Sequence, residues 1–196
     1  KIILAGLNYR DHAKELGMAI PKEPIIFLKP PSALVGDKDD IIYPPQAKRL
    51  DYEAELAFVI KKEGKNIPEN KAWEYILGFT CLNDVTARDL QIIDGQWTRA
   101  KSFDTFCPVG PYLVTDIDPT KLSIRSYLNG KIRQDSNTSN FIFPINRLLS
   151  FISSVMTIFP GDIISTGTPK GVGQMKKSDI IEIEIEGIGK LKNKVV

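Results

Sequence analysis

Hydrophobic residues recur mostly with the two-residue period of β-strands, and this pattern predicts a mainly β protein. Several short apolar runs are bounded by Gly, Pro or charged residues, as expected for strands. Alternation on both sides of Asn129-Gly130 predicts a hairpin with a type I′ turn. Segment 32–45 predicts a strand, a turn and a second strand. The other predicted strands lie in 1–7, 23–30, 50–60, 71–84 (where a short helical turn leads into the strand), 161–173 (running into a Gly-rich loop) and the closing hairpin 179–196.

Helical patterns are few and mostly short. Segment 8–17 has helical composition, with Asn8 and Asp11 resembling a capping box and Gly17 as a stop. One or two helical turns are expected in 85–94, and the longest helix in 144–158, with Pro144 near its N-terminus. The apolar face of this last helix is predicted to contain Ile145, Leu148, Leu149, Ile152, Val155 and Met156.

The order of these elements lacks the strand–helix–strand rhythm of a doubly wound sheet, and neither a repeat nor a linker divides the chain. We therefore expect residues 1–196 to form one mostly β domain of α+β type. The chain begins at Lys1 rather than at a methionine, so we expect its termini to be trimmed.

Composition narrows the functional classes. With 42% hydrophobic and 26% charged residues the chain is typical of a folded globular protein. A net charge of +2 gives no strong field for nucleic acid, and we expect neither a nucleic-acid nor a membrane partner. The two cysteines form no CxxC pattern, which favours a reducing compartment, and we expect a cytoplasmic protein.

The segment LDYEAELAFVI, residues 50–60, contains acids where a buried strand should have none. In a strand, Glu53 and Glu55 share a face, roughly 6.5 to 7 Å apart at Cα. An edge strand with a solvated acidic face would tolerate them, but the apolar continuation of the segment favours burial. If the two carboxylates are buried, a counter-charge must lie close to them. The segment alone supports a solvated edge strand and a buried strand about equally.

Asp84 follows an apolar strand, and on the helix expected next Asp84, Arg88 and Gln91 fall on one face at i, i+4 and i+7. Asp84 is either a helix-start acid paired with Arg88 or a third metal ligand. In the second case Arg88 could hold a substrate carboxylate through its planar fork.

His12 and Glu15 stand at i, i+3, close enough for the carboxylate to orient the imidazole, although a surface pair is the commoner outcome at this spacing. His12 is the only histidine, which excludes a zinc site built from several imidazoles. A cation bound here must be held mainly by oxygen, which favours Mg²⁺, Mn²⁺ or Ca²⁺.

Two further segments carry polar groups. Lys101 precedes an aromatic segment and by itself indicates little. Thr166 and Thr168 lie in a Gly-rich loop that does not match the phosphate-binding pattern, because Lys170 precedes Gly171.

Five segments in this order resemble the C-terminal catalytic domain of the fumarylacetoacetate hydrolase (fumarylacetoacetase) family: GLNYRDHAKELG, LDYEAELAFVI, NDVTARDLQ, AKSFDTFCPVGP and GDIISTGTPKGVG. The likeness spans nearly the whole chain and is greatest to the small acylpyruvases, oxaloacetate decarboxylases and catechol-pathway isomerases. It implies a mixed β-sandwich roll with a few short helices, and a homodimer. Larger fumarylacetoacetases carry a further acidic ligand where this chain has Ala5, which points away from the tyrosine-degradation enzyme.

The resemblance also assigns roles. It implies that Glu53, Glu55 and Asp84 bind Mg²⁺ or Mn²⁺, with Ca²⁺ as an alternative. It makes His12 and Glu15 the water-activating dyad, on a segment that acts as a lid. Substrate-binding positions are Arg88, Gln91, Lys101 and Thr168, with Lys101 also counted as catalytic.

The implied substrate is a small 2-oxo acid that reacts through a metal-stabilised enolate, in acylpyruvate hydrolysis and/or oxaloacetate decarboxylation. The alternative within the family is a 2-hydroxyhepta-2,4-diene-1,7-dioate isomerase or oxopentenetricarboxylate decarboxylase of catechol degradation. A metal-stabilised β scaffold without catalysis would explain the acidic residues, but not the matching histidine, arginine and lysine.

Overall fold

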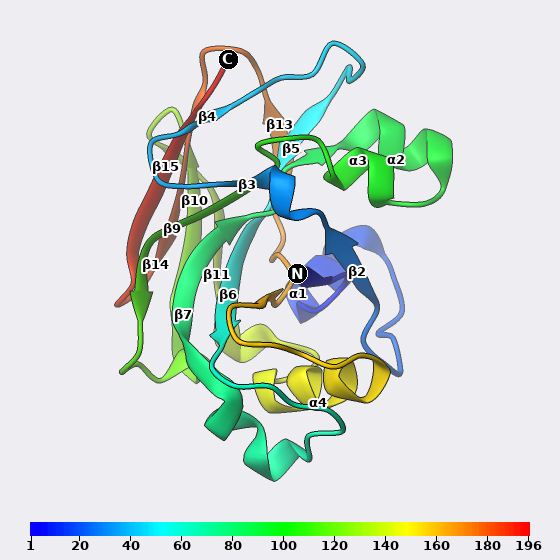
Figure 1. Ribbon diagram of the computed structural model, residues 1–196. Coiled ribbons are helices and arrows are strands. Elements are labelled where there is room, and N and C mark those ends of the chain that lie inside the picture. Colours follow the sequence, from blue (N-terminus) through cyan, green and yellow to red (C-terminus); the bar gives the residue numbers. More distant parts are fainter.

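Fifteen strands, four α-helices and four short 3-10 helices make up the computed structural model, which describes residues 1–196 (Figure 1). The strands form three sheets of seven, five and three strands, and the helices lie around them. The predicted mainly β fold is confirmed.

The seven-stranded sheet is mixed, with parallel pairs β1–β12 and β3–β9 and antiparallel pairs elsewhere. Strand β6 lies in its middle between β12 and β7, so the edge-strand interpretation of this segment is wrong. In spatial order the strands are β2 (Ile26–Lys29), β1 (Ile2–Ala5), β12 (Ile163–Ser165), β6 (Ala54–Ile60), β7 (Ile76–Asn83), β9 (Cys107–Val114) and β3 (Leu34–Val35).

The five-stranded sheet packs its β14 and β15 against β7 of the first sheet, giving two layers over one core (Figure 1). The predicted turn is confirmed, because Asn129 (φ 52°) and Gly130 (φ 74°) join β10 to β11 with the positive φ values of a type I′ turn. The closing hairpin, β14 with β15, is confirmed as well. The strands in spatial order are β11 (Lys131–Asn137), β10 (Ser123–Leu128), β14 (Ile180–Ile185), β15 (Gly189–Val195) and β4 (Asp40–Ile41).

The single strand expected over 50–60 is wrong, because the chain breaks at Glu53 and changes sheets. Strand β5 (Leu50–Tyr52) pairs with β13 (Gly173–Met175) and β8 (Thr86–Ala87) in the third sheet, whereas β6 belongs to the first. The Glu53 backbone explains the break: its N–H donates to the Asn83 side chain at 3.0 Å and its carbonyl accepts from Asp84 N–H at 2.9 Å. The strands predicted in 32–45 exist as β3 and β4, but they pair with β9 and β15 rather than with each other.

Four α-helices surround the sheets: α1 (Arg10–Leu16), α2 (Arg88–Asp94), α3 (Thr98–Lys101) and α4 (Ile145–Val155). In α1, Gly17 ends the helix in the left-handed conformation as predicted, but Asn8 does not cap it. Asn8 instead bonds to Phe143 and to Thr166 O across the core. The 3-10 helices are Pro31–Ala33, Glu69–Tyr75, Pro119–Lys121 and Thr138–Asn140.

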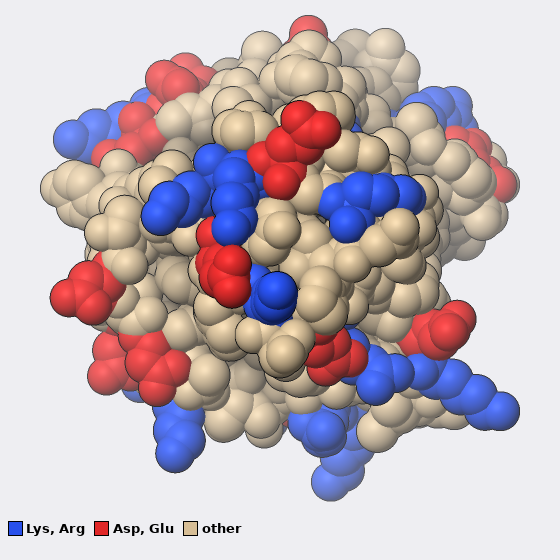
Figure 2. Space-filling view, turned by 60° about the horizontal axis from the view of Figure 1, so that its bottom comes forward, with Lys and Arg blue, Asp and Glu red and all other residues tan.

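Helix α4 covers one end of the first sheet (Figure 1), and the predicted apolar face is confirmed at its four core positions, Ile145, Leu148, Leu149 and Ile152. Val155 is 55% exposed and Met156 lies beyond the helix, so the face is one turn shorter than predicted. Figure 2 shows acidic and basic side chains interspersed over the end of the molecule that faces the viewer there. None of the helices has the length and apolar character needed to cross a membrane.

Candidate active site

Three carboxylates meet where β5, β6 and β7 come together. Glu53 stands at the break between β5 and β6, Glu55 follows in β6, and Asp84 comes directly after β7. Because Ala54 pairs with Asn83 in the β6–β7 register, Glu53 and Asp84 adjoin at the ends of neighbouring strands. All three side chains are buried, and one oxygen from each lies within 4.8 Å of the others. The prediction that Asp84 shares a helix face with Arg88 and Gln91 is wrong, because the helix begins at Arg88.

Cationic side chains neutralise Glu53. Lys101 Nζ lies 3.1 Å from Glu53 Oε2, and Arg88 Nη2 donates to Oε1. Burial alone would raise the pKa of Glu53, but the charges of Lys101 and Arg88 outweigh it and lower the pKa to about 2. Glu53 is thus held as a carboxylate.

Glu55 has no cationic partner. Its Oε2 accepts hydrogen bonds from Ser165 Oγ at 2.5 Å and from Gly167 N–H at 3.0 Å. Burial, followed by the charges of Asp84 and Glu53, raises the pKa of Glu55 well above its ordinary value. Glu55 is therefore the carboxyl group of the cluster whose ionised form the surrounding protein stabilises least.

Lys29 is a site residue that the sequence analysis missed. Its side chain is fully buried, and Nζ donates to three backbone oxygens, of Val85, Lys101 and Phe106, at 2.6 to 3.0 Å. The same nitrogen lies 2.8 Å from Asp84 Oδ1. The available signal was a lysine inside the apolar strand IIFLKP, where an unpaired charge would be costly.

Arg88 is fixed by acids from two elements. Its Nε donates to Asp51 at 3.0 Å and its Nη1 to Gln91 Oε1 at 2.6 Å, in addition to its bond to Glu53. Asp51, fully buried, also accepts from Arg49 Nε at 2.9 Å. Asp51 is thus committed to two arginines and does not belong to the acidic cluster of Glu53, Glu55 and Asp84.

The proposed dyad forms on α1. His12 Nδ1 lies 2.9 Å from Glu15 Oε2. The Glu15 carboxylate also accepts from Gly171 N–H at 3.1 Å, and so connects α1 to the Gly-rich loop. In that loop Thr168 donates to Ala54 O at 2.9 Å and accepts from Gln134 Nε2 at 2.8 Å.

A cavity of about 620 Å³ brings these groups together. Its walls come from α1, the start of β2, the β5–β6 break, α2, α3 and the Gly-rich loop. Of the three carboxylates in the acidic cluster, Glu53 and Asp84 line the cavity and Glu55 does not. The lining includes eight of the nine expected site residues: His12, Glu15, Glu53, Asp84, Arg88, Gln91, Lys101 and Thr168.

The acidic cluster fits a hard divalent cation. All its donors are carboxylate oxygens, which Mg²⁺, Mn²⁺ and Ca²⁺ prefer, and their mutual spacing lets one ion contact all three. The raised pKa of Glu55 is consistent with the same assignment, because a divalent cation would offset both the burial and the repulsion by Asp84 and Glu53 that raise it.

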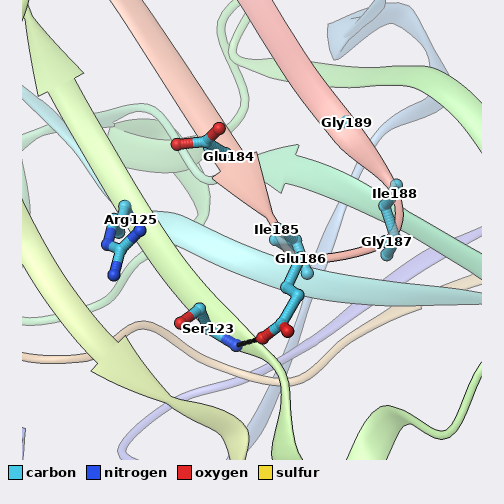
Figure 3. A pocket seen from close by; sticks show the side chains of 8 residues that line it. All are labelled: Ser123, Arg125, Glu184, Ile185, Glu186, Gly187, Ile188 and Gly189. Atoms are coloured by element: carbon cyan, nitrogen blue, oxygen red, sulfur yellow. Dashed lines mark hydrogen bonds between the residues drawn. The ribbon is translucent and has the colours of Figure 1, made fainter.

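A second cavity, of about 570 Å³, lies on the five-stranded sheet beside the β14–β15 turn (Figure 3). Its polar groups are already engaged: Glu186 accepts from Ser123 N–H at 3.0 Å, and Glu184 accepts from Tyr127 Oη at 2.5 Å. Arg125 pairs with Asp135 at 3.0 Å. This cavity contains none of the expected site residues.

Comparison with known proteins agrees with the geometry. Residues 1–196 match the family described as fumarylacetoacetate (FAA) hydrolase C-terminal, and the chain belongs to that family. The mitochondrial oxaloacetate tautomerase Fahd2a of Rattus norvegicus is 47% identical over 207 residues, covering 100% of this chain and 66% of that protein.

Two solved structures have the same fold. The 5-carboxymethyl-2-hydroxymuconate delta-isomerase from Mycobacterium smegmatis is 49% identical with a TM-score of 0.95, covering 100% of this chain and 78% of that one. The fumarylpyruvate hydrolase from Pseudomonas aeruginosa, in complex with Mn²⁺ and pyruvate, is 33% identical with a TM-score of 0.94, covering 100% and 88%. The resemblance and the fold expected from the sequence are confirmed.

Proposed function

We propose that the protein is a divalent-metal-dependent enzyme acting on 2-oxo acids, by C–C bond hydrolysis of acylpyruvates and/or decarboxylation of oxaloacetate. The observation that carries this proposal is the shared cavity, whose lining combines Glu53 and Asp84 of the acidic cluster with the His12–Glu15 pair, Arg88 and Lys101. The fumarylpyruvate hydrolase, whose structure contains Mn²⁺ and pyruvate, supports it as a relative of the same fold.

In this proposal Glu53, Glu55 and Asp84 hold Mg²⁺ or Mn²⁺. The bound cation supplies a Lewis acid for the carboxylate and oxo oxygens of the substrate. Arg88, Gln91, Lys101 and Thr168 bind the same end of the substrate. The positive charges of Arg88 and Lys101, beside the carboxylates, favour the extra negative charge that develops at the oxo group.

His12 acts as the base in hydrolysis. It takes a proton from water, and Glu15 stabilises the imidazolium and fixes the ring orientation through the 2.9 Å contact. The water oxygen bonds to the distal carbonyl carbon of the acylpyruvate, and the bond from that carbon to the pyruvate methylene breaks. The electron pair stays on the methylene carbon, which takes up the proton that His12 had removed from water, so the products are pyruvate and a carboxylic acid and His12 is again neutral.

The test is turnover of a panel of acylpyruvates and oxaloacetate with Mg²⁺, Mn²⁺ or Ca²⁺ and after chelation. We expect metal-dependent turnover, and a fall of about 100-fold or more in acylpyruvate hydrolysis for His12→Ala and Glu15→Ala, the usual scale of general-base catalysis. Oxaloacetate decarboxylation needs no activated water and should fall much less.

Metal affinity should barely change in either variant, since neither residue is a proposed ligand. Hydrolysis that persists in both variants while metal binding is lost would contradict the mechanism. A protein that binds the metal but turns over no 2-oxo acid would instead support a non-catalytic scaffold.

Isomerisation is the second candidate, because relatives 49% and 47% identical are named as an isomerase and a tautomerase. It would use the same cation and proton-transferring groups without water attack. Enol–keto conversion of oxaloacetate, followed by ultraviolet absorbance, distinguishes it from hydrolysis: conversion without any C–C cleavage would favour this candidate.

We further propose that residues 1–196 act as one catalytic domain and that the chain forms a homodimer. A particle mass twice the 21.9 kDa of one chain, measured by light scattering, would support the dimer.

A further inference from the structure

Part of the cavity lining is apolar and aromatic. Trp97 packs edge to face on Phe27, with ring centroids 5.2 Å apart, and approaches Gly6 so closely that a Cβ there would lie 3.1 Å from the indole. Phe27 in turn lies under Lys101, whose Nζ is 4.9 Å from the ring centroid. This contact joins the apolar wall directly to the acidic cluster.

The rim of the cavity is apolar as well. Leu16 at the end of α1 and Met18 just after it are each 52% exposed, and Ile25 before β2 is 45% exposed. Ile92 on α2 is 76% exposed. Large apolar side chains that are exposed around one cavity indicate a binding surface for an apolar ligand. Covering them removes apolar area from water, which lowers the free energy of the complex.

The cavity offers few cations to a second acidic group, because the proposed function already assigns Arg88 and Lys101 to the 2-oxo acid end of the substrate. Three cationic side chains line it, and each is already paired: Arg49 with Asp51, Arg88 with Asp51 and Glu53, and Lys101 with Glu53 and Asp84. The titratable groups that α1 presents to the cavity are His12 and the acid Glu15. A carboxylate at the far end of a substrate would therefore meet apolar side chains and a like charge, with its desolvation uncompensated.

We propose that the substrate is a 2-oxo acid with an apolar far end, such as an alkyl chain, rather than a second carboxylate. This inference rests on the proposed function, which places the 2-oxo acid end at the acidic cluster, and it favours acylpyruvates with aliphatic acyl groups over oxaloacetate. Leu16, Met18, Ile25, Ile92, Phe27 and Trp97 are the residues that select the far end.

The test is calorimetric binding of unreactive 2-oxo acids to the Mn²⁺-loaded protein: pyruvate, 2-oxobutanoate, 2-oxopentanoate, 2-oxohexanoate and 2-oxoglutarate. We expect affinity to rise two- to fourfold per added methylene, the value for a methylene partly or fully removed from water. 2-Oxohexanoate should bind at least about tenfold more tightly than 2-oxoglutarate, which has a similar length but a charged end.

Two neighbouring isoleucines supply a matched pair of variants. Ile92 lines the cavity, whereas Ile93 is 71% exposed and does not, so neither substitution disturbs the core. Ile92→Lys should weaken 2-oxohexanoate binding and strengthen 2-oxoglutarate binding, and Ile93→Lys should change neither.

The inference would be overturned if affinity did not change along the chain-length series. It would also be overturned if 2-oxoglutarate bound more tightly than 2-oxohexanoate and lost that advantage in Arg49→Leu. Since these ligands are not turned over, the outcome is independent of catalysis. An intact chain-length trend without turnover of any acylpyruvate would count against the proposed function alone. Failure of pyruvate itself to bind would overturn both.

Discussion

Lys29 and Lys101 are both buried beside the carboxylates of the acidic cluster, and each makes several polar contacts. Lys101 contacts Glu53, Asp84 and Thr86, and Lys29 contacts Asp84 and three backbone carbonyls. Burial alone would lower the pKa of Lys101, but the charges of Asp84 and Glu53 outweigh it and raise the pKa. Both lysines are thus part of the site's electrostatics rather than ordinary surface residues.

Replacing Lys29 by Gln should destabilise the protein by about 3 to 5 kcal/mol, because one partner of a buried ion pair is removed and carbonyl oxygens lose donors. Equilibrium urea unfolding measures the loss. In a double-mutant cycle, Asp84→Asn should cost less in the Lys29→Gln background than in the wild type.

The control for Lys29 is Lys62→Gln, which removes the exposed Lys62–Glu74 pair and should cost at most about 1 kcal/mol. Additive effects of the Lys29 and Asp84 variants would show that the 2.8 Å contact contributes nothing to stability.

At the scale of elements, the ends of β6 and β7 position two of the proposed ligands. Glu53 N–H bonds to the Asn83 side chain, and Asp84 N–H bonds to Glu53 O. These two bonds replace the ladder that a continuous strand would have formed, and they fix Glu53 relative to Asp84. The β6–β7 register and these two bonds at the break therefore hold Glu53 next to Asp84.

Asn83→Ala should leave the buried Glu53 N–H without an acceptor, at a cost of about 1 to 3 kcal/mol in stability. It should also weaken Mn²⁺ binding, measured by calorimetry, because Glu53 is no longer held in place.

Asn193→Ala is the matched control: Asn193 is equally buried and donates to Gly36 O and Asp39 O, away from the cavity. It should lower stability and leave Mn²⁺ affinity unchanged. Equal Mn²⁺ affinity in the Asn83 and Asn193 variants would contradict the positioning role of Asn83.

At the scale of the whole molecule, the proposed cation should stabilise the fold, because its three ligands converge only in the folded chain. A metal at about 100 times its Kd adds roughly 2.7 kcal/mol to the free energy of unfolding. For a domain of this size that corresponds to a Tm about 5 to 10 °C higher with Mg²⁺ or Mn²⁺ than after chelation. Thermal unfolding followed by circular dichroism gives the difference.

Glu55→Gln should abolish the metal-dependent rise in Tm, while Glu74→Gln, an exposed acid on the 3-10 helix before β7, should retain it. A rise that survives in Glu55→Gln would place the cation elsewhere in the molecule.

Local signals predicted many elements correctly. The Asn129-Gly130 turn, the Gly17 helix end and the buried positions of α4 depend on backbone conformations and a side-chain period that a short segment determines by itself. The ordered motifs also indicated the family, which the comparisons confirm.

The tertiary structure decided how segments distant in the chain meet. The break at Glu53 depends on Asn83 thirty residues away, and the partners of β3 and β4 lie in β9 and β15. Asp84 belongs to a strand end rather than to a helix face, and Asn8 bonds across the core instead of capping α1.

Lys29 is the clearest case of what the sequence left undetermined. A lysine in an apolar strand indicates that some partner exists, but hydrogen-bond acceptors 56, 72 and 77 residues away are brought to it only by folding. The sequence by itself determined which residue types were present and the local conformation of each segment. The tertiary structure determined which charges neutralise one another, because the energy of a buried charge depends on its distance to partners from other elements.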